Sequence, residues 1–367
     1  MAMEPQALET QSNTKRMNET THRYQPGMPP VAVIILNWNG SHLLREYLPA
    51  VVATTPGDLG RVIVADNGSE DDSLEILARE FPSVEVIRFD RNHGFARGYN
   101  KAIEETQYPY TVLLNSDVAT DEGWLEPLYT FMETHEEAGG CQPKILSYRH
   151  STTFEYAGAC GGFIDRNGYP YCRGRIFDVC EEDHGQYDQE REVFWATGAA
   201  LMVRTELYLQ AGGLDPEFFA HMEEIDLCWR ILLMGKSLWA VPSARVYHLG
   251  GGSLPPNNPR KVYLNFRNNL LMLHKNLPDS DRDATLLRRR LLDTIAWAKF
   301  VLSGQWRNAG AVVKAHRDFA RMRRQYTSHP SVNLLKARRD TRVNILIDFY
   351  LRGLRTFDRL RIGSGDE

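Results

Sequence analysis

Blocks of consecutive apolar residues alternate with segments of helical spacing along the first third of the chain. The apolar blocks predict buried strands, and they lie at 31–40, where the block closes on a polar turn, and at 62–66, 84–90 and 111–115. Segments with helical spacing begin near 41, 71 and 96. Strands and helices that alternate at this pitch predict an α/β fold with a mostly parallel central sheet and right-handed crossovers.

The pattern changes from about residue 139, where glycines and aromatic residues become dense and predict irregular or antiparallel structure. Further on, 193–203 and 237–247 predict strands, 222–234 predicts a helix, and the chain after Pro259 has helical spacing. Residues 1–28 are polar and predict a disordered tail. Residues 279–367 predict a helical C-terminal extension.

Composition limits the class of protein. The 367 residues are 43% apolar and 25% charged, and the formal net charge is −4, which gives no electrostatic case for a nucleic-acid partner. Five cysteines without a CxxC pair argue against a disulfide framework and a structural zinc site, and they fit the cytoplasm. We expect neither a signal peptide nor a transmembrane helix, because no sufficiently long apolar run occurs.

Basic residues dominate from Arg288 onward. The segments at 286–306 and 343–362 mix basic and apolar residues at helical spacing, which is typical of helices that lie on an anionic membrane. Such contact would place the protein on the inner face of the plasma membrane. The alternative is that these helices pack on the rest of the chain or on a second subunit, as in a homodimer.

Polar residues at the strand ends are candidates for ligand contacts, because open α/β sheets bind ligands at the carboxyl edge of their strands. Asp66 ends the second strand, where a carboxylate can accept hydrogen bonds from a nucleobase or a ribose. The glycine-rich segment 92–100 precedes a helix whose positive end favours phosphate. Ordinary turns and helix caps are the alternative for both segments, and for 92–100 by itself that alternative is favoured.

Asn115-Ser116-Asp117 ends the fourth strand, and His248 is followed by three glycines at 250–252. Asp117 and His248, with two phosphate oxygens, would form an open site for Mg²⁺ or Mn²⁺, since manganese also accepts imidazole. A single histidine is more often structural than a metal ligand. The neighbouring glycines favour a ligand role, and we expect their loop to close over a substrate.

A cluster of acids opens the helix at 222–234. Glu223 and Asp226 lie three residues apart on one face, and Arg230 is placed to pair with Asp226. Glu224 points to a different side. Acids are common in the first turn of a helix, but aromatic neighbours would also raise the pKa of a carboxyl group and suit it to general-base catalysis.

These segments together resemble the family-2 glycosyltransferases of the GT-A fold, in particular a rhamnosyltransferase-like subgroup. The resemblance covers about 31–278, and it rests on eight motifs in the same order: VIILNWNG, VADNGSEDD, NHGFARGYN, LLNSDV, TGAALMVR, GGLDPEFF, EEIDLCWR and YHLGGGS. It implies a catalytic domain at 29–278, with a nucleotide-binding half at 29–138 and an acceptor-binding half at 139–278.

The resemblance also implies roles for single residues. Glu224 would be the general base, at a position where the family usually has Asp. Asp117 and His248 would bind the metal, and Asn115 replaces the first acid of the family's DxD motif. The implied donor-binding residues are Asn37, Asn39, Asp66, Arg97, Asn100, Asn115 and Gly198. The implied acceptor-binding residues are Asp215, Glu223 and Asp226.

The implied activity is transfer of a sugar, with inversion, from dTDP-rhamnose or a UDP-hexose to a glycan or polyisoprenyl-linked acceptor in cell-surface polysaccharide synthesis. One alternative is a non-catalytic sugar-nucleotide-binding protein on the same fold. A nucleotidyltransferase would normally carry a basic, glycine-rich loop where this chain has NWNGSHLL, and a dehydrogenase would show GxGxxG after a strand.

Overall fold

A nine-stranded mixed sheet runs through the computed structural model, which describes residues 22–250, 258–327, 329–360 and 362. Its strand order is β11-β13-β6-β12-β4-β1-β2-β3, and β5 pairs with β13. The strands of this sheet are β1 Val31–Asn37, β2 Gly60–Asp66, β3 Glu85–Arg88, β4 Tyr110–Leu114, β5 Val118–Thr120, β6 Ala138–Ser147, β11 Arg191–Val193, β12 Ala200–Arg204 and β13 Ser237–His248.

A second, four-stranded antiparallel sheet has the order β10-β9-β8-β7. Its strands are β7 Gly162–Ile164, β8 Pro170–Cys172, β9 Arg175–Ile176 and β10 Val179–Cys180. The helices are α1 Ser41–Thr54, α2 Ser73–Glu80, α3 Phe95–Thr106, α4 Leu125–Thr134, α5 Thr205–Gln210, α6 Glu223–Leu233, α7 Pro259–Asn276, α8 Asp279–Leu302, α9 Trp306–Met322 and α10 Leu334–Ala337. Short helical turns lie at η1 Pro216–Phe218, η2 Arg323–Gln325, η3 Ile347–Leu351 and η4 Phe357–Arg359.

The predicted parallel sheet is confirmed in β3, β2, β1 and β4, which pair in parallel. Asn37 lies opposite Asp66, and Ile35 lies opposite Leu114, so the carboxyl ends of three strands meet at one edge.

The strand predicted at 193–203 is wrong in its middle. Residues 194–199 leave the large sheet, because Trp195 exchanges backbone hydrogen bonds with Gly162 in the small sheet.

Residue 139 does mark a change of pattern, but it does not begin an irregular region. Ala138–Ser147 forms the long strand β6, which pairs in parallel with β13, and the expected antiparallel structure follows in β7 to β10.

At the N-terminal end of the chain, part of the predicted disordered tail is ordered. The backbone N–H of Tyr24 donates to the Thr106 carbonyl at 2.8 Å, and its ring lies 5.3 Å from that of Tyr108. Residues 1–21 of that predicted tail lie outside the described chain.

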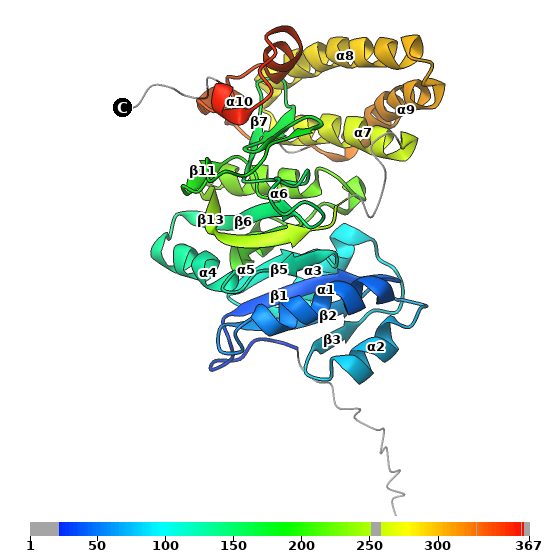
Figure 1. Cartoon of the computed structure of the whole chain (residues 1–367). Helices are drawn as coiled ribbons and strands as arrows, with labels where there is room; N and C mark the ends of the chain where they lie inside the picture. The colour runs from blue at the N-terminus through cyan, green and yellow to red at the C-terminus, as the bar shows by residue number, and fades with distance from the viewer. Residues whose placement is uncertain (1–21, 251–257, 328, 361, 363–367) are drawn as a thin grey trace, which may run out of the picture.

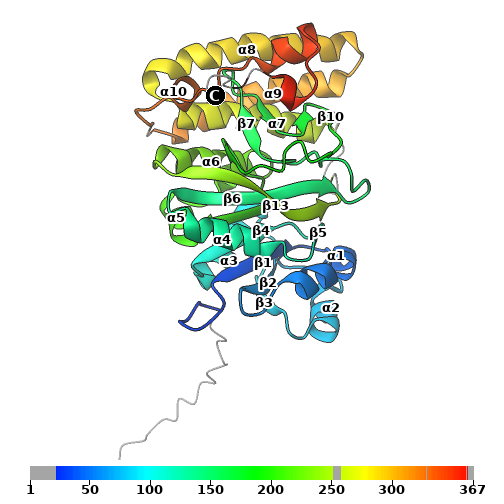
Figure 2. The same ribbon diagram turned by 60° about the vertical axis from the view of Figure 1, so that its left-hand side comes forward.

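The C-terminal helices form a layer at the end of the molecule opposite β3 (Figures 1 and 2). The predicted helix at 286–306 is confirmed as α8, which ends at Leu302. The predicted continuous helix at 343–362 is wrong, because the described part of this segment is divided into a short helical stretch at 345–351, which includes η3, and the turn η4. Gly353 has a φ of 70° in the left-handed region, which ends helical structure there, and Phe349, Phe357 and Leu360 turn inward to buried positions.

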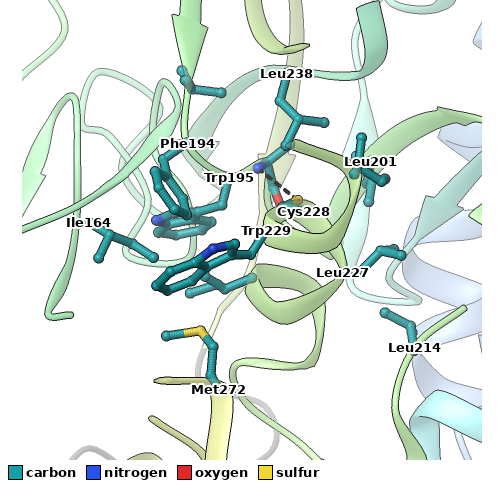
Figure 3. Close-up of a cluster of buried hydrophobic side chains, with 14 of the residues drawn as sticks. Ile164, Phe194, Trp195, Leu201, Leu214, Leu227, Cys228, Trp229, Leu238 and Met272 are labelled. Carbon is teal, nitrogen blue, oxygen red and sulfur yellow. Dashed lines mark hydrogen bonds between the residues drawn. The ribbon is translucent and has the colours of Figure 1, made fainter. Parts of the chain in front are cut away.

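A buried cluster of aromatic and aliphatic side chains holds α6 against the strands (Figure 3). The rings of Trp229 and Phe194 meet edge to face with centroids 5.1 Å apart, and the Cys228 thiol lies 3.6 Å from the Ala196 carbonyl oxygen. Met272 of α7 lies on the other side of Trp229 in Figure 3. This packing fixes the position of the first turn of α6, where Glu223 and Glu224 lie.

All five cysteines are free thiols. Within the described ranges, no helix combines the length and apolar character that crossing a bilayer requires.

A buried ion pair within α8 faces the domain beneath this helix. Arg289 donates to Asp293 at 3.1 Å, and the two residues are 2% and 1% exposed. The Arg289 guanidinium also lies 3.7 Å from the centre of the Tyr169 ring, and Asp293 contacts His316 at 3.0 Å. The C-terminal helices are therefore docked through specific polar contacts and not only through apolar packing.

We expect Asp293→Ala to lower the free energy of unfolding by about 3–5 kcal/mol, because Arg289 would keep a buried charge without its partner. The double variant Arg289→Met with Asp293→Ala should lose less, since no unpaired charge remains. Denaturant unfolding checks both. Glu75→Ala, which breaks the exposed pair between Glu75 and Arg79, is the control and should cost less than about 1 kcal/mol. Equal losses in the single and double variants would contradict this account.

Candidate functional site

The ends of β1 and β2 form a fixed polar cluster. The Asn37 amide donates to Asp66 Oδ2 at 3.0 Å, and the backbone N–H of Ser69 donates to Asp66 Oδ1 at 3.0 Å. Asn37 Oδ1 is buried and has no hydrogen-bond partner among the described residues. Asn39 is exposed at the rim, and its side chain accepts from the backbone of Glu70 at 2.8 Å. The structure thus brings the predicted residues Asn37, Asn39 and Asp66 together.

The loop between β3 and α3 is held by a residue to which the sequence assigned no ligand role. The amide of Asn67 donates to Asn92 at 3.1 Å and to the Gly94 carbonyl at 3.2 Å, and it accepts from the backbone N–H of His93 at 2.9 Å. Arg97 in the first turn of α3 is exposed and makes no ion pair or hydrogen bond within the described chain. Its guanidinium is therefore available to an anion beside the positive end of α3.

Asn100 has less capacity for a ligand than the sequence suggested. Its Oδ1 accepts from the backbone N–H of Leu214 at 2.9 Å and from the Tyr208 hydroxyl at 2.5 Å. Its Nδ2 donates to the Leu214 carbonyl at 2.8 Å. These bonds use most of the hydrogen-bonding capacity of the amide, so Asn100 fixes the segment that leads to Asp215.

Asp117 and His248 are 131 residues apart in sequence, and their side chains meet with Asp117 Oδ1 3.0 Å from His248 Nε2. The antiparallel pairing of β5 with β13 places Val118 opposite His248, which brings the two side chains to one point. The amide nitrogen of Asn115 lies 3.5 Å from the same imidazole nitrogen. The predicted metal-binding pair is therefore assembled. Gly251 and Gly252, part of the loop expected to close over a substrate, lie outside the described residues.

Glu155 contacts His248 on the side opposite Asp117, and the sequence analysis did not identify it. Its Oε2 lies 3.1 Å from His248 Nδ1, the nitrogen that faces away from Asp117. No motif surrounds Glu155, and it is 93 residues from His248. The close approach also explains Gly250, because a Cβ there would lie 2.2 Å from Glu155 Oε1. Carboxylates commonly orient a metal-binding histidine in this way.

The contacts among Asp117, Glu155 and His248 shift the pKa values of His248 and Asp117. Burial by itself would lower the pKa of His248, but the hydrogen bonds and charges of Asp117 and Glu155 raise it to about 10. Burial would raise the pKa of Asp117, but the contact with His248 lowers it instead. Among the described residues, no three His, Cys, Asp or Glu side chains converge as a complete metal cage. Because a protonated imidazole nitrogen cannot bind a metal, Mn²⁺ would have to displace the Nε2 proton of His248. Asp117 and His248 would then supply one oxygen and one nitrogen and leave positions for phosphate oxygens.

Each of the two carboxylates at the start of α6 has one oxygen without a partner. Oε2 of Glu223 and Oε2 of Glu224 are both buried, and neither has a hydrogen-bond partner among the described residues. Burial raises the pKa of both groups, and the charge of Glu224 adds to the increase at Glu223. A Cβ on Gly198 would lie 3.4 Å from Glu224 Cβ, so Gly198 adjoins Glu224 closely. Glu224 is the less buried of the two acids.

The loop before α6 adopts a strained backbone. Phe219, His221 and Met222 have φ values of 66°, 68° and 73°, which non-glycine residues rarely adopt. The amide of Asn268 on α7 holds this loop by donating to the carbonyls of Phe218, Ala220 and His221 at 2.8, 2.9 and 2.7 Å. Positioning of Glu223 and Glu224 therefore depends on a residue of α7 that sequence reasoning did not identify.

Asp226 differs from its predicted acceptor-binding role. It is fully buried and accepts from Arg230 at 3.0 Å, Lys275 at 2.9 Å and Asn276 at 2.7 Å. Burial would raise its pKa, but the charges of Arg230 and Lys275 lower it. Asp226 thus has no surface to offer an acceptor and instead anchors α6. Asp215 accepts from Lys275 at 2.8 Å and from the Tyr326 hydroxyl at 2.9 Å, so its carboxylate is also engaged.

Part of the chain matches a known protein family. Residues 32–177 match the glycosyl transferase family 2 model. An N-acetylglucosaminyl-diphospho-decaprenol L-rhamnosyltransferase of Mycobacterium tuberculosis is 28% identical over 235 residues, which cover 59% of this chain and 75% of that protein. N-acetylgalactosaminyltransferase 4 of Drosophila melanogaster is 24% identical over 254 residues, which cover 65% of this chain and 38% of that relative.

The crystal structure of GalNAc-T7 with UDP, GalNAc and Mn²⁺ superposes with a TM-score of 0.53 at 16% sequence identity. The alignment covers 70% of this chain and 49% of GalNAc-T7, so it bears on the fold of the shared part alone. The family match, the homologous rhamnosyltransferase and the shared fold lead to one assignment. The chain contains a family-2 glycosyltransferase domain of the GT-A fold.

Proposed function

We propose that this chain is an inverting, metal-dependent glycosyltransferase that moves a sugar from a nucleoside-diphosphate sugar to a hydroxyl group of a glycan or lipid-linked acceptor. The observation that carries this proposal is Glu224, whose buried carboxylate has an oxygen without a partner and lies beside Gly198. In this proposal residues 29–138 bind the nucleotide and 139–278 bind the acceptor. Residues 279–367 are a helical extension.

The donor would lie along the edge formed by β1, β2 and β4. Asn37, Asn39 and Asp66 would contact the base and ribose, and the free guanidinium of Arg97 would contact the diphosphate. We keep both dTDP-rhamnose and a UDP-hexose as donors. The homologous rhamnosyltransferase favours the first. Thymine and uracil differ by one methyl group, worth only about 1 kcal/mol in a pocket.

Asp117 and His248 would hold Mg²⁺ or Mn²⁺, with Asn115 beside them and Glu155 orienting the imidazole. A bound divalent ion would neutralise negative charge that develops on the diphosphate leaving group. Manganese fits this pair better than magnesium, because one of the two protein ligands is an imidazole nitrogen.

Glu224 would take the proton of the acceptor hydroxyl. The acceptor oxygen then forms a bond to the anomeric carbon while the bond from that carbon to the diphosphate oxygen breaks on the opposite face. A single displacement inverts the configuration and needs no covalent enzyme intermediate. Glu223, whose pKa burial raises well above its usual range, would remain protonated and could donate a hydrogen bond to the acceptor.

We further propose an acceptor carried on a polyisoprenyl diphosphate, in a reaction of cell-surface polysaccharide synthesis on the cytoplasmic side of the membrane. The support is the decaprenol-linked substrate in the name of the mycobacterial relative. The competing function is sugar-nucleotide binding without transfer. The unpaired oxygen of Glu224 favours catalysis, because a structural carboxylate would be expected to have partners, as Asp226 does.

Replacing Glu224 by Gln tests the proposal. We expect kcat to fall by about 10²–10⁴-fold, because the amide cannot accept the proton, while nucleotide binding stays unchanged. Glu223→Gln is the matched control: a protonated glutamate and a glutamine are similar in shape and charge, so turnover should fall far less. Release of UDP or dTDP with acceptor measures both. Near-normal turnover in Glu224→Gln would refute the assigned base.

The pH profile follows from the same carboxylate. Burial raises the pKa of Glu224 above its usual value of 4.5, and the base is active only when deprotonated. Activity should therefore fall as the pH decreases through a value above 4.5. The measurement is kcat/KM against pH with saturating metal. An acid limb at or below the usual carboxyl range would contradict the burial effect.

Glu155→Gln tests the residue behind the metal-binding pair. We expect the apparent affinity for Mn²⁺ to fall by about 10–100-fold, because the orienting carboxylate of His248 is lost. Thermal shift with UDP or dTDP over a Mn²⁺ titration gives this affinity. Glu126→Gln on the exposed surface of α4 is the control. Unchanged Mn²⁺ affinity in Glu155→Gln would remove Glu155 from the site.

A further inference from the structure

The outer side of α8 exposes an apolar stripe. Leu287, Leu291, Ile295 and Leu302 are 60%, 63%, 67% and 88% exposed. Their spacings of four, four and seven residues place them on one side of the helix, since 3.6 residues make a turn. Large apolar side chains that are exposed singly need no explanation, but four in one row mark a contact surface.

Cations border this stripe on both sides. Arg290 flanks one side of the row, and Arg288 and Lys299 flank the other, as the helical repeat of 3.6 residues requires. Arg288 and Arg290 are exposed and make no ion pair or side-chain hydrogen bond with any residue that the structure describes. The α8 face is defined as the four stripe residues with Arg288, Arg290 and Lys299. Asp293 points inward to Arg289, and Asp283, one turn before Leu287, is exposed at the N-terminal end of the row beside Arg282.

A neighbouring turn extends the same surface. In η3, Tyr350 and Leu351 are 58% and 80% exposed. The ammonium group of Lys299 lies 5.5 Å from the centre of the Tyr350 ring, which places the turn beside the C-terminal half of α8. Apolar and aromatic side chains next to basic ones are typical of a surface that meets the boundary between lipid headgroups and acyl chains.

A hollow of about 250 Å³ lies at the N-terminal half of α8. Its lining combines apolar side chains with two guanidinium groups and one carboxylate: Leu286, Leu287, Phe319, Arg290, Arg323 and Asp283. The excess of guanidinium groups suits a phosphate group, which arginine binds with paired hydrogen bonds. The α8 face thus has a basic recess of headgroup size beside its apolar stripe.

We propose that the α8 face docks the protein onto a bilayer that contains anionic phospholipids. Two copies that met through this face about a two-fold axis would bring the same cations together, whereas an anionic bilayer would neutralise them. α8 is the outermost helix at the end opposite β3 in both views, so a flat surface can reach it without covering the nucleotide-binding strands (Figures 1 and 2). The proposal rests on this surface and not on the proposed sugar transfer.

Co-sedimentation of the full chain with phosphatidylcholine vesicles, with and without phosphatidylglycerol, tests the docking. We expect binding only when phosphatidylglycerol is present, and weaker binding as salt increases. Leu291→Glu should weaken the partition coefficient by about tenfold or more. Replacing Arg288 and Arg290 together by Gln should weaken it by about 30-fold, at roughly 1 kcal/mol for each cation.

Met234→Glu is the matched control, because Met234 is 42% exposed at the end of α6 and lies outside the α8 face. It should bind vesicles like the unchanged protein, and thermal unfolding should show that all variants are folded. Equal vesicle binding by Leu291→Glu and Met234→Glu would overturn the proposal. So would a dimer in light scattering that Leu291→Glu converts to a monomer without affecting vesicle binding. Because no donor or acceptor is present, either failure leaves the test of sugar transfer untouched.

Discussion

The anchoring of α6 by the buried carboxylate of Asp226 is the constraint on which the rest of the site depends. Arg230 of the same helix and Lys275 and Asn276 at the end of α7 all donate to Asp226. Removing any one donor would leave a buried charge with fewer partners, which is costly in a low-dielectric interior. Together with the packing of Trp229, this network fixes the first turn of α6, where Glu223 and Glu224 each keep one carboxylate oxygen without a partner.

Acids with opposite environments therefore lie within one helix. Asp226 is saturated with donors, and its pKa is lowered, whereas the pKa values of Glu223 and Glu224 are raised by burial. A carboxylate that is kept basic by burial and has one oxygen without a partner suits proton transfer. The strained loop at 219–222 ends where these acids begin, and Asn268 holds it in place. The position of the acids in the proposed active site therefore depends on the packing of α7.

The C-terminal helices have two sides with different roles. On the inner side, Arg289 and Asp293 form a buried pair and α7 contributes the residues that hold α6 and its preceding loop. On the outer side, α8 exposes its apolar stripe with unpaired cations. The two alternatives for the basic C-terminal region, packing on the rest of the chain and contact with another surface, are therefore compatible. The first is observed, and the second is the basis of the docking proposal.

The sequence by itself determined the alternating strands and helices of the first half, and it placed Asp66, Asp117, Glu224 and His248 near the ends of strands and helices, because these signals are local: apolar blocks, strand ends and short motifs. It could not reveal Glu155, which has no motif and lies 93 residues from the histidine it contacts. It also misassigned Asp226, whose donors Lys275 and Asn276 are 49 and 50 residues away, and it predicted a helix through Gly353. Only the tertiary structure decided these points. The partners of a buried polar group depend on which strands and helices pack together, and the local spacing of residues does not predict that packing.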